Sequence, residues 1–218
     1  KFVKELGGEM LMMMPPYHGA LMRGTSQQTF EQFAKVGEAG VTIMVQDAPL
    51  SGVDLPVPLL IKMAKEIETV KCFKIECAQA ASKLRKLVVE GGDAIEGPFD
   101  GEEGITLFAD LEAGATGNMS SAMIPDLIKP VVLDYLAGEF DKSEDKYNNI
   151  LPVINYENRQ CGFRATKVIM KEGGVINSDF CRHPIPPLEE QTKAGLIKLI
   201  KKYDPIALSW GKWNLKYL

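Results

Sequence analysis

The chain has 218 residues, of which 45% are hydrophobic and 25% charged, and this length suffices for one sizeable hydrophobic core. Its net charge of −4 provides no basic field, so nucleic acid and anionic membrane surfaces are not expected partners. No apolar run approaches the roughly 18 residues that a membrane-spanning helix needs. The four cysteines have neither metal-type spacing nor disulfide density, and we therefore expect a reduced, cytoplasmic setting.

Short apolar runs alternate with helical patterns in the first part of the chain. In chain order, strands are predicted over 9–14, 41–46, 70–76, 93–97 and 116–121, and helices over 26–38, 56–68, 80–92 and 102–115. Further helices are predicted over 126–137, 142–156, 159–171 and 188–201. Short, continuously apolar strands separated by helices are typical of a parallel sheet covered by helices. The sequence therefore predicts an α/β domain with a C-terminal helical extension.

The third predicted strand, "VKCFKIE", places a lysine and a glutamate near its carboxyl end. Side chains alternate along a strand, so Lys74 and Glu76 are expected to share one face with Val70 and Cys72. In parallel α/β architectures, chemistry occurs at this end of the strands. An amine that is buried there has to be paired or neutral, and a neutral amine attacks carbonyl carbons. The spacing alone leaves a purely structural Lys74–Glu76 ion pair as an open alternative.

Four segments, "GGEMLMMMPPYH", "VQDAPLSGV", "FKIE" and "LEAGATGNMSS", occur in the order and spacing of one known family. The chain resembles the dihydrodipicolinate synthase / N-acetylneuraminate lyase family over essentially its whole length. The resemblance implies a (β/α)8 TIM barrel with a C-terminal helical bundle, and it matches the five strands here to strands four through eight. Residues 1–138 are then a partial barrel and residues 139–218 the helical extension. It also implies that Lys74 is the lysine that forms a Schiff base.

Departures from the family pattern bear on the reaction. Gln46 stands where the family usually carries a proton-relaying tyrosine, and Ser51 stands where the synthases carry a substrate-binding arginine. The tyrosine pair of an earlier loop is replaced by Tyr17 and His18. These replacements disfavour a synthase that binds aspartate semialdehyde.

The segments "FKIE", "VQDAP", "DGEEGITLFADLEAGATG" and "ENRQCGFRATKVIMKEGGVI" are more similar to a branch of 2-keto-3-deoxy-sugar-acid dehydratases. This resemblance implies that Lys74 and Glu76 are both catalytic. The candidate substrate-binding residues are Tyr17, His18, Gln46, Asn118 and Ser120. An iminium on Lys74 acidifies the C3 protons, and Glu76 can then act as acid or base in expelling the C4 hydroxyl.

The predicted function is therefore a Schiff-base hydro-lyase that acts on a 2-keto-3-deoxy sugar acid such as L-2-keto-3-deoxyarabonate. The alternatives are an aldol-type pyruvate lyase, a dihydrodipicolinate-type synthase and a catalytically silent family member. We expect neither a cofactor nor a metal, and the two histidines, with no third candidate ligand nearby, do not indicate a metal site. The expected partners are a small-molecule 2-oxo acid and further copies of the chain, in a homodimer or homotetramer.

The family's first three βα units have no counterpart in this sequence. Five strands cannot close an eight-stranded barrel, and the open edges of such a sheet can pair with other chains. We therefore expect the sequence to be part of a longer chain, or to be completed by a partner.

Overall fold

The computed structural model describes residues 1–16, 24–49 and 52–214, and these residues form two compact units. The first unit comprises Lys1–Glu102 and Thr106–Met119, and the second comprises Glu103–Ile105 and Ser120–Leu218.

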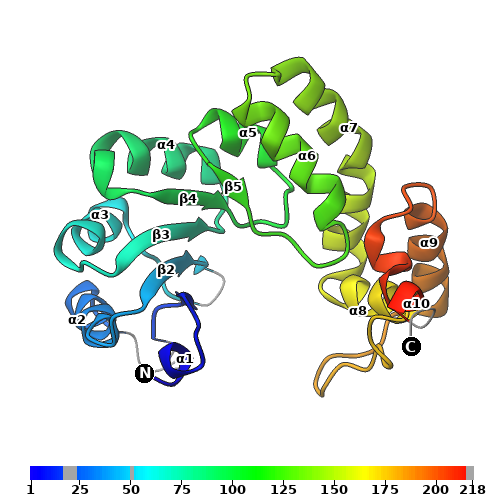
Figure 1. Ribbon diagram of the computed structural model, residues 1–218, viewed down its shortest axis with the longest axis horizontal. Coiled ribbons are helices and arrows are strands. Elements are labelled where there is room, and N and C mark those ends of the chain that lie inside the picture. The colour runs from blue at the N-terminus through cyan, green and yellow to red at the C-terminus, as the bar shows by residue number, and fades with distance from the viewer. Residues whose placement is uncertain (17–23, 50–51, 215–218) are drawn as a thin grey trace. The chain divides into compact units, whose positions relative to one another are not determined.

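The first unit is built around a parallel five-stranded sheet in the order β1-β2-β3-β4-β5. Its strands are β1 (Met10–Met13), β2 (Thr42–Asp47), β3 (Val70–Ile75), β4 (Gly97–Asp100) and β5 (Gly117–Asn118). Its helices are α1 (Phe2–Glu5), α2 (Ser26–Gly37), α3 (Val57–Glu66), α4 (Ala80–Gly91), the 3-10 helix η2 (Gly92–Ala94) and α5 (Leu107–Glu112). Figure 1 shows the arrowheads of β2, β3 and β4 pointing the same way. The predicted α/β architecture is confirmed.

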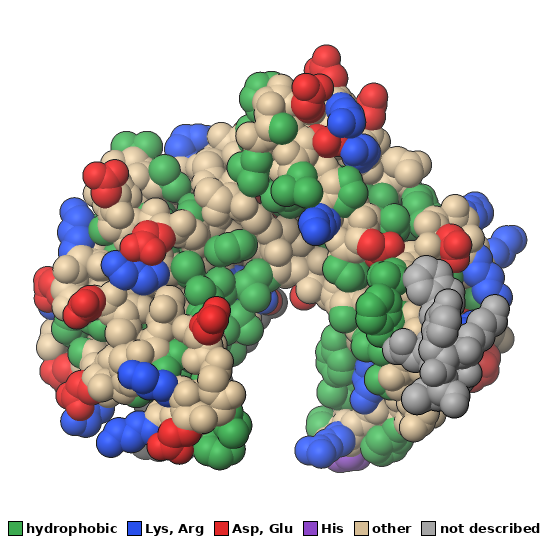
Figure 2. All heavy atoms as spheres, viewed as in Figure 1, with side chains coloured by type: hydrophobic (Ala, Val, Ile, Leu, Met, Phe, Trp, Pro, Cys, Tyr) green, Lys and Arg blue, Asp and Glu red, His purple; other side chains and the backbone are tan. Residues whose placement is uncertain are grey.

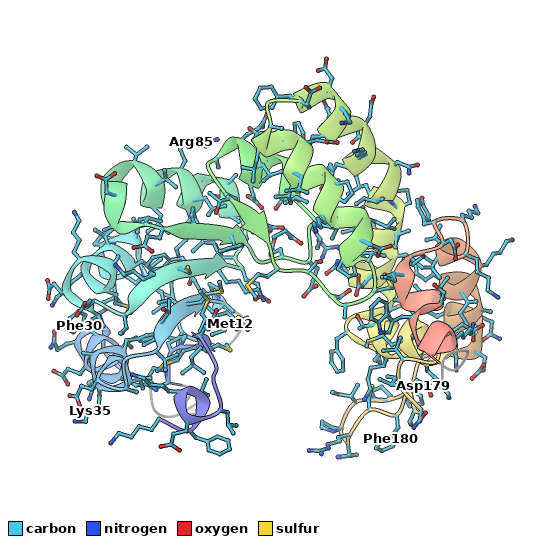
Figure 3. The ribbon with its side chains drawn as sticks, in the orientation of Figure 1. Met12, Phe30, Lys35, Arg85, Asp179 and Phe180 are labelled. Atoms are coloured by element: carbon cyan, nitrogen blue, oxygen red, sulfur yellow. The ribbon has the colours of Figure 1, made fainter. Side chains whose placement is uncertain are left out.

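The two faces of the sheet differ in what covers them. On one face, Val45, Phe73 and Ile75 have no exposed surface, and burial of each such side chain contributes about 1.5–3 kcal/mol. Figure 1 shows α2, α3 and α4 on one side of the strands, and Figure 3 shows Met12 on the side away from α2. Met12 pairs with Met44 of β2 and remains 44% exposed. The face that carries Met12 and Met44 is therefore the less covered one.

Strand β4 lies further along the chain than predicted. The strand predicted over 93–97 is wrong, because Gly92–Ala94 form η2 and the strand runs over Gly97–Asp100. A Gly-Pro pair usually marks a turn, so the sequence pattern placed the strand before Pro98 instead of across Gly97 and Pro98. Here Pro98 extends the strand, and its carbonyl accepts a hydrogen bond from the Thr116 N–H at 2.8 Å. A Cβ at Gly97 would lie 3.1 Å from Cys72 Sγ, which explains the glycine beside β3.

The second unit is helical over its described residues. Its elements are α6 (Pro125–Leu136), α7 (Phe140–Tyr156), the π-helical segment η3 (Glu157–Cys161), α8 (Arg164–Glu172), α9 (Glu190–Ile200), the 3-10 helix η4 (Ile206–Leu208) and α10 (Trp210–Asn214). The buried hydroxyl of Ser143 donates to the carbonyl of Val131 at 2.8 Å and links α7 to α6. The start of a helix at Arg159 is a wrong prediction, because the π segment and Gly162, with φ of +59°, delay α8 to Arg164.

The surface is of mixed charge. On the face drawn in Figure 2, acidic and basic side chains of the described residues are interspersed over both units. Figure 3 shows Phe30 and Lys35 projecting from the outer side of α2, where Lys62 Nζ lies 4.4 Å from the centre of the Phe30 ring. None of the helices within the described ranges has both the length and the apolar character needed to cross a lipid bilayer.

Candidate active site

Three predicted site residues meet at the carboxyl ends of β2 and β3. Gln46 lies opposite Lys74 in the pairing of these strands, and Glu76 follows directly after β3. Lys74 is only 8% exposed although it carries an ammonium group. The less covered sheet face therefore carries a buried amine, a carboxylate and an amide at one end.

An irregularity in β3 brings Gln46 to Lys74. The pairing runs Ile43 with Val70 and then Met44 with Cys72, so β3 contains one extra residue at this point. Val70 therefore takes the helix-covered face, and its predicted place on the face of Lys74 is wrong. Without the shift, Gln46 would lie opposite Phe73, whose side chain points to the other face. Bulges of this kind re-aim side chains and are common next to active sites.

The carboxylate of Glu76 is held by two donors that reach the same oxygen. Lys74 Nζ lies 2.8 Å from Glu76 Oε2, and Gln46 Nε2 donates to the same Oε2 at 2.7 Å. The backbone N–H of Glu76 donates to the carbonyl of Asp47 at 2.8 Å. An ionised carboxylate makes hydrogen bonds roughly twice as strong as those between neutral groups. Both ends of Glu76 are therefore fixed against the last two residues of β2.

Gly101 packs directly against the Lys74–Glu76 pair. A Cβ at this position would lie 2.8 Å from Lys74 Cγ, 2.9 Å from the Ile75 carbonyl oxygen and 3.0 Å from Glu76 Cβ. Any other residue would therefore displace Lys74 or Glu76. Sequence patterns did not reveal this constraint, because it depends on how closely the turn after β4 approaches β3.

A buried ion pair lies behind the site, on the helix-covered face. Asp47 has no exposed surface, and its Oδ2 lies 2.6 Å from Lys83 Nζ of α4. Burial raises the pKa of Asp47, and the hydrogen bond and charge of Lys83 oppose that rise. The pair fastens α4 to the end of β2, next to Gln46. Neither residue was predicted to belong to the site. The signal in the sequence that could have indicated Asp47 is its position directly after Gln46, at the end of a buried strand.

Asn118 lies in a buried cluster and not beside Lys74. It pairs with Asp100 in the sheet, while its neighbour Gly117 pairs with Phe99, the residue that lies opposite Lys74. Its Nδ2 donates to Asp100 Oδ2, on the face opposite to Lys74. The strand alternation therefore turns Asn118 away from the amine, and a direct substrate contact by Asn118 does not fit this geometry.

Asp100 and Asp110 form a buried carboxyl pair within this cluster. Neither side chain has exposed surface, and the two share a hydrogen bond. Burial, together with the charge of Asp100, raises the pKa of Asp110 to about 7, although a hydrogen bond from Thr106 opposes the rise. Asp100 Oδ1 also accepts the N–H of Glu102 at 3.1 Å. The pair therefore holds the turn that contains Gly101.

We predict that this carboxyl pair makes stability fall as the pH rises. Because the pKa of Asp110 is about 7 instead of 3.8, the folded protein holds this proton more tightly than the unfolded chain. The stabilisation is fully present below about pH 4 and is lost as the pH rises through about 7. Relative to Asp110→Asn, the native chain should lose about 1.4 kcal/mol per pH unit in between. Urea unfolding of both proteins at several pH values measures this difference, and a pH-independent difference would contradict the prediction.

The loop after β5 belongs to the second unit. Ser120 Oγ lies 3.5 Å from the Ser121 carbonyl oxygen, and the Ser121 hydroxyl makes a hydrogen bond to Glu157. Glu157 is 3% exposed and also accepts from Thr166 Oγ1 at 3.2 Å. Burial raises the pKa of Glu157, and these two hydrogen bonds oppose the rise. The buried glutamate thus anchors the loop that carries Ser120.

Tyr17 and His18 lie outside the residues that the structure describes. Within the described ranges, no group of three or more His, Cys, Asp or Glu side chains is arranged to hold a metal ion.

The model of the dihydrodipicolinate synthetase family matches residues 1–203. This chain belongs to the dihydrodipicolinate synthetase family. The family predicted from the four sequence segments is therefore confirmed.

Relatives of this family member are found among both curated proteins and solved structures. The chain is 51% identical over 209 residues to an L-2-keto-3-deoxyarabonate dehydratase of Azospirillum brasilense, covering 95% of this chain and 68% of that protein. The dihydrodipicolinate synthase of Aquifex aeolicus matches with a TM-score of 0.83 at 20% identity, over 92% of this chain and 68% of that one. The enzyme of Rhodopseudomonas palustris matches with a TM-score of 0.76 at 24% identity, over 88% and 65%. The chain thus spans about two thirds of the length of these relatives.

Proposed function

We propose that this family member is a Schiff-base hydro-lyase that removes water from a 2-keto-3-deoxy sugar acid such as L-2-keto-3-deoxyarabonate. The observation that carries the proposal is the buried Lys74 amine, held 2.8 Å from the Glu76 carboxylate at the carboxyl end of β3. The 51% identity to a dehydratase supports the choice of reaction and substrate.

Lys74 is the proposed nucleophile. The Lys74 ammonium loses one proton to water, and the free amine then attacks the C2 ketone of the substrate. The ketone oxygen leaves as water, which forms an iminium between Lys74 and C2. The positive nitrogen acidifies the protons on C3, since the electrons of the broken C–H bond can move into the iminium. The burial of Lys74 keeps bulk water away from this intermediate.

Glu76 is the proposed acid and base of the elimination. It removes one C3 proton to give an enamine, and it returns a proton to the C4 hydroxyl, which leaves as water. The resulting conjugated iminium loses a proton from C5 and gains one at C3, which leaves an enol between C4 and C5. The enol then gains a proton at C4 and loses its hydroxyl proton, so the terminal CH2OH becomes an aldehyde. Hydrolysis of the imine then frees Lys74. The sum of these steps is the loss of one water molecule and the release of a semialdehyde oxo-acid.

The remaining predicted residues are proposed in supporting roles. Tyr17, His18 and Ser120 are proposed to contact the substrate, with Gln46 beside Glu76. Asn118 is proposed to act indirectly. It donates a hydrogen bond to Asp100, and Asp100 precedes Gly101, which packs against Lys74. Gln46 has no titratable proton, so it cannot relay one from a C4 hydroxyl as a retro-aldol cleavage requires. This favours elimination over cleavage.

The architecture is proposed in finer detail as well. The five strands are proposed to be strands four through eight of a (β/α)8 barrel within residues 1–138, with 139–218 as a helical extension. The TM-score of 0.83 to a dihydrodipicolinate synthase supports this assignment. A homodimer or homotetramer in the cytoplasm is the proposed state. Leu133, Leu136 and Phe140 are more than half exposed and offer an apolar surface for such an assembly.

Product analysis tests the proposed reaction. The protein is incubated with L-2-keto-3-deoxyarabonate, and the products are separated and identified by mass spectrometry. Dehydration gives a semialdehyde oxo-acid, whereas an aldol-type lyase releases pyruvate. Borohydride reduction in the presence of pyruvate, followed by intact mass, detects the imine. Pyruvate release would contradict dehydration and show an aldol-type lyase. A folded protein with neither turnover nor adduct would be a catalytically silent family member.

A further inference from the structure

Glu76 presents its two carboxylate oxygens to different surroundings. Oε2 receives both Lys74 Nζ at 2.8 Å and Gln46 Nε2 at 2.7 Å. Among the described residues, no side chain donates a hydrogen bond to Oε1, and the Glu76 side chain is 26% exposed. A carboxylate offers about four acceptor sites, two on each oxygen, so the described side chains leave both sites of Oε1 open. Within the part of the chain that the structure describes, Oε2 is therefore held by side chains and Oε1 is not.

The two donors on Oε2 behave differently during a Schiff-base reaction. When Lys74 bonds to carbon, its nitrogen retains one hydrogen instead of three, and its contact with Glu76 weakens or ends. The Gln46 amide does not titrate and does not react, so it can donate to Oε2 at every stage. Gln46 is thus the side-chain donor that persists after the amine is consumed.

Three contacts at the end of β2 fix the position of Gln46. The irregular pairing of β2 with β3 sets it opposite Lys74. The next residue, Asp47, accepts the N–H of Glu76 at 2.8 Å through its carbonyl. The carboxylate of Asp47 is bound by Lys83 at 2.6 Å on the other face. The amide therefore projects from a rigid strand end, as a residue that orients another must.

We propose that Gln46 is a positioning residue for Glu76: it fixes Oε2 and thereby presents Oε1 as the oxygen that carries protons to and from the substrate. The inference rests on the proposed hydro-lyase function and adds a residue whose effect is transmitted through Glu76. It also assigns the proton-carrying role to one of two chemically equivalent atoms.

The test is Gln46→Met, which keeps the length of the side chain and removes the donor. We expect kcat to fall ~10–100-fold, the usual effect of losing a hydrogen bond to a charged group, while KM changes less than about threefold. Borohydride trapping of pyruvate on Lys74 should be unchanged. Gln46→Asn, which is too short to reach Oε2, should behave in the same way and serves if the methionine variant does not fold.

Two controls separate orientation of Glu76 from other effects. Gln27 of α2 also donates to a glutamate carboxylate, Glu31 Oε1, at 2.8 Å, but on an exposed helix face. Gln27→Met should leave kcat and KM unchanged. In a Glu76→Gln background, Gln46→Met should cost less than about twofold, because there is no carboxylate left to orient.

The outcomes distinguish the inference from the proposed function. If the native chain dehydrates its substrate and Gln46→Met raises KM with kcat unchanged, Gln46 binds substrate and the inference is overturned. The inference is also overturned if Gln46→Met costs the same activity with and without the Glu76 carboxylate. If the native chain neither traps pyruvate nor turns over, the proposed function fails, and the inference fails with it.

Discussion

Replacing Lys74 with alanine is expected to abolish borohydride-trapped pyruvate adducts and to lower kcat by on the order of 10⁴-fold or more. Lys74 is the amine held at the carboxyl end of β3 beside Glu76. Without it no iminium forms at C2, and the C3 protons are then not acidified. The measurement is the intact mass of the protein after reduction, followed by peptide mapping of the modified residue. The fold should persist, because the Glu76 carboxylate that is left behind is 26% exposed and keeps its hydrogen bond from Gln46.

A lysine on the same strand provides the matched control. Lys71 lies near the amino end of β3, three residues before Lys74, and forms an ion pair with Glu96 at 3.0 Å. Lys71→Ala removes an amine and an ion pair of similar length without touching the proposed site, so the adduct and turnover should remain. A persistent adduct in Lys74→Ala would show that another amine forms the imine. Loss of the adduct in Lys71→Ala would show that disturbance of β3 alone abolishes it.

The sheet could be predicted from the sequence because its signals are local. Each of the first three strands is a short apolar run that ends before a proline or a helix, and these positions hold in the structure. Strand β4 was misplaced because "GPFD" has the composition of a turn. Its strand character comes from pairing with β3 and from the space that Gly97 leaves for Cys72 and Phe99. That information is not local.

The site was predictable only where it depends on alternation within one strand. Lys74 and Glu76 share a face because they are two residues apart, and the resemblance to the family then suggested their roles. The hydrogen bond between Gln46 and Glu76 could not be predicted, since it depends on one extra residue in the pairing of β2 with β3. The direction of the Asn118 side chain could not be predicted for a related reason, because a strand of two residues does not reveal which face its side chains take.

The second large effect is expected from Glu76→Gln. This variant should still form the pyruvate adduct, yet turn over the sugar acid ~10²–10⁴-fold more slowly, the usual cost of losing a general acid or base. Glutamine keeps the size of the side chain and can still accept from the Gln46 amide. It cannot take the C3 proton or return one to the C4 hydroxyl. Single-turnover kinetics with the sugar acid, combined with trapping of pyruvate, separate the two steps.

A second glutamate, which directly precedes β4, makes this test specific to the carboxylate beside Lys74. Glu96 pairs with Lys71 in the way that Glu76 pairs with Lys74, and its side chain is 54% exposed. Glu96→Gln should therefore leave turnover unchanged, because exposed ion pairs contribute little to stability. If Glu76→Gln also turned over at the native rate, the Lys74–Glu76 contact would be structural, and a different group would move the protons. If Glu76→Gln lost the adduct as well, the carboxylate would be needed to free the amine for attack and not for elimination alone.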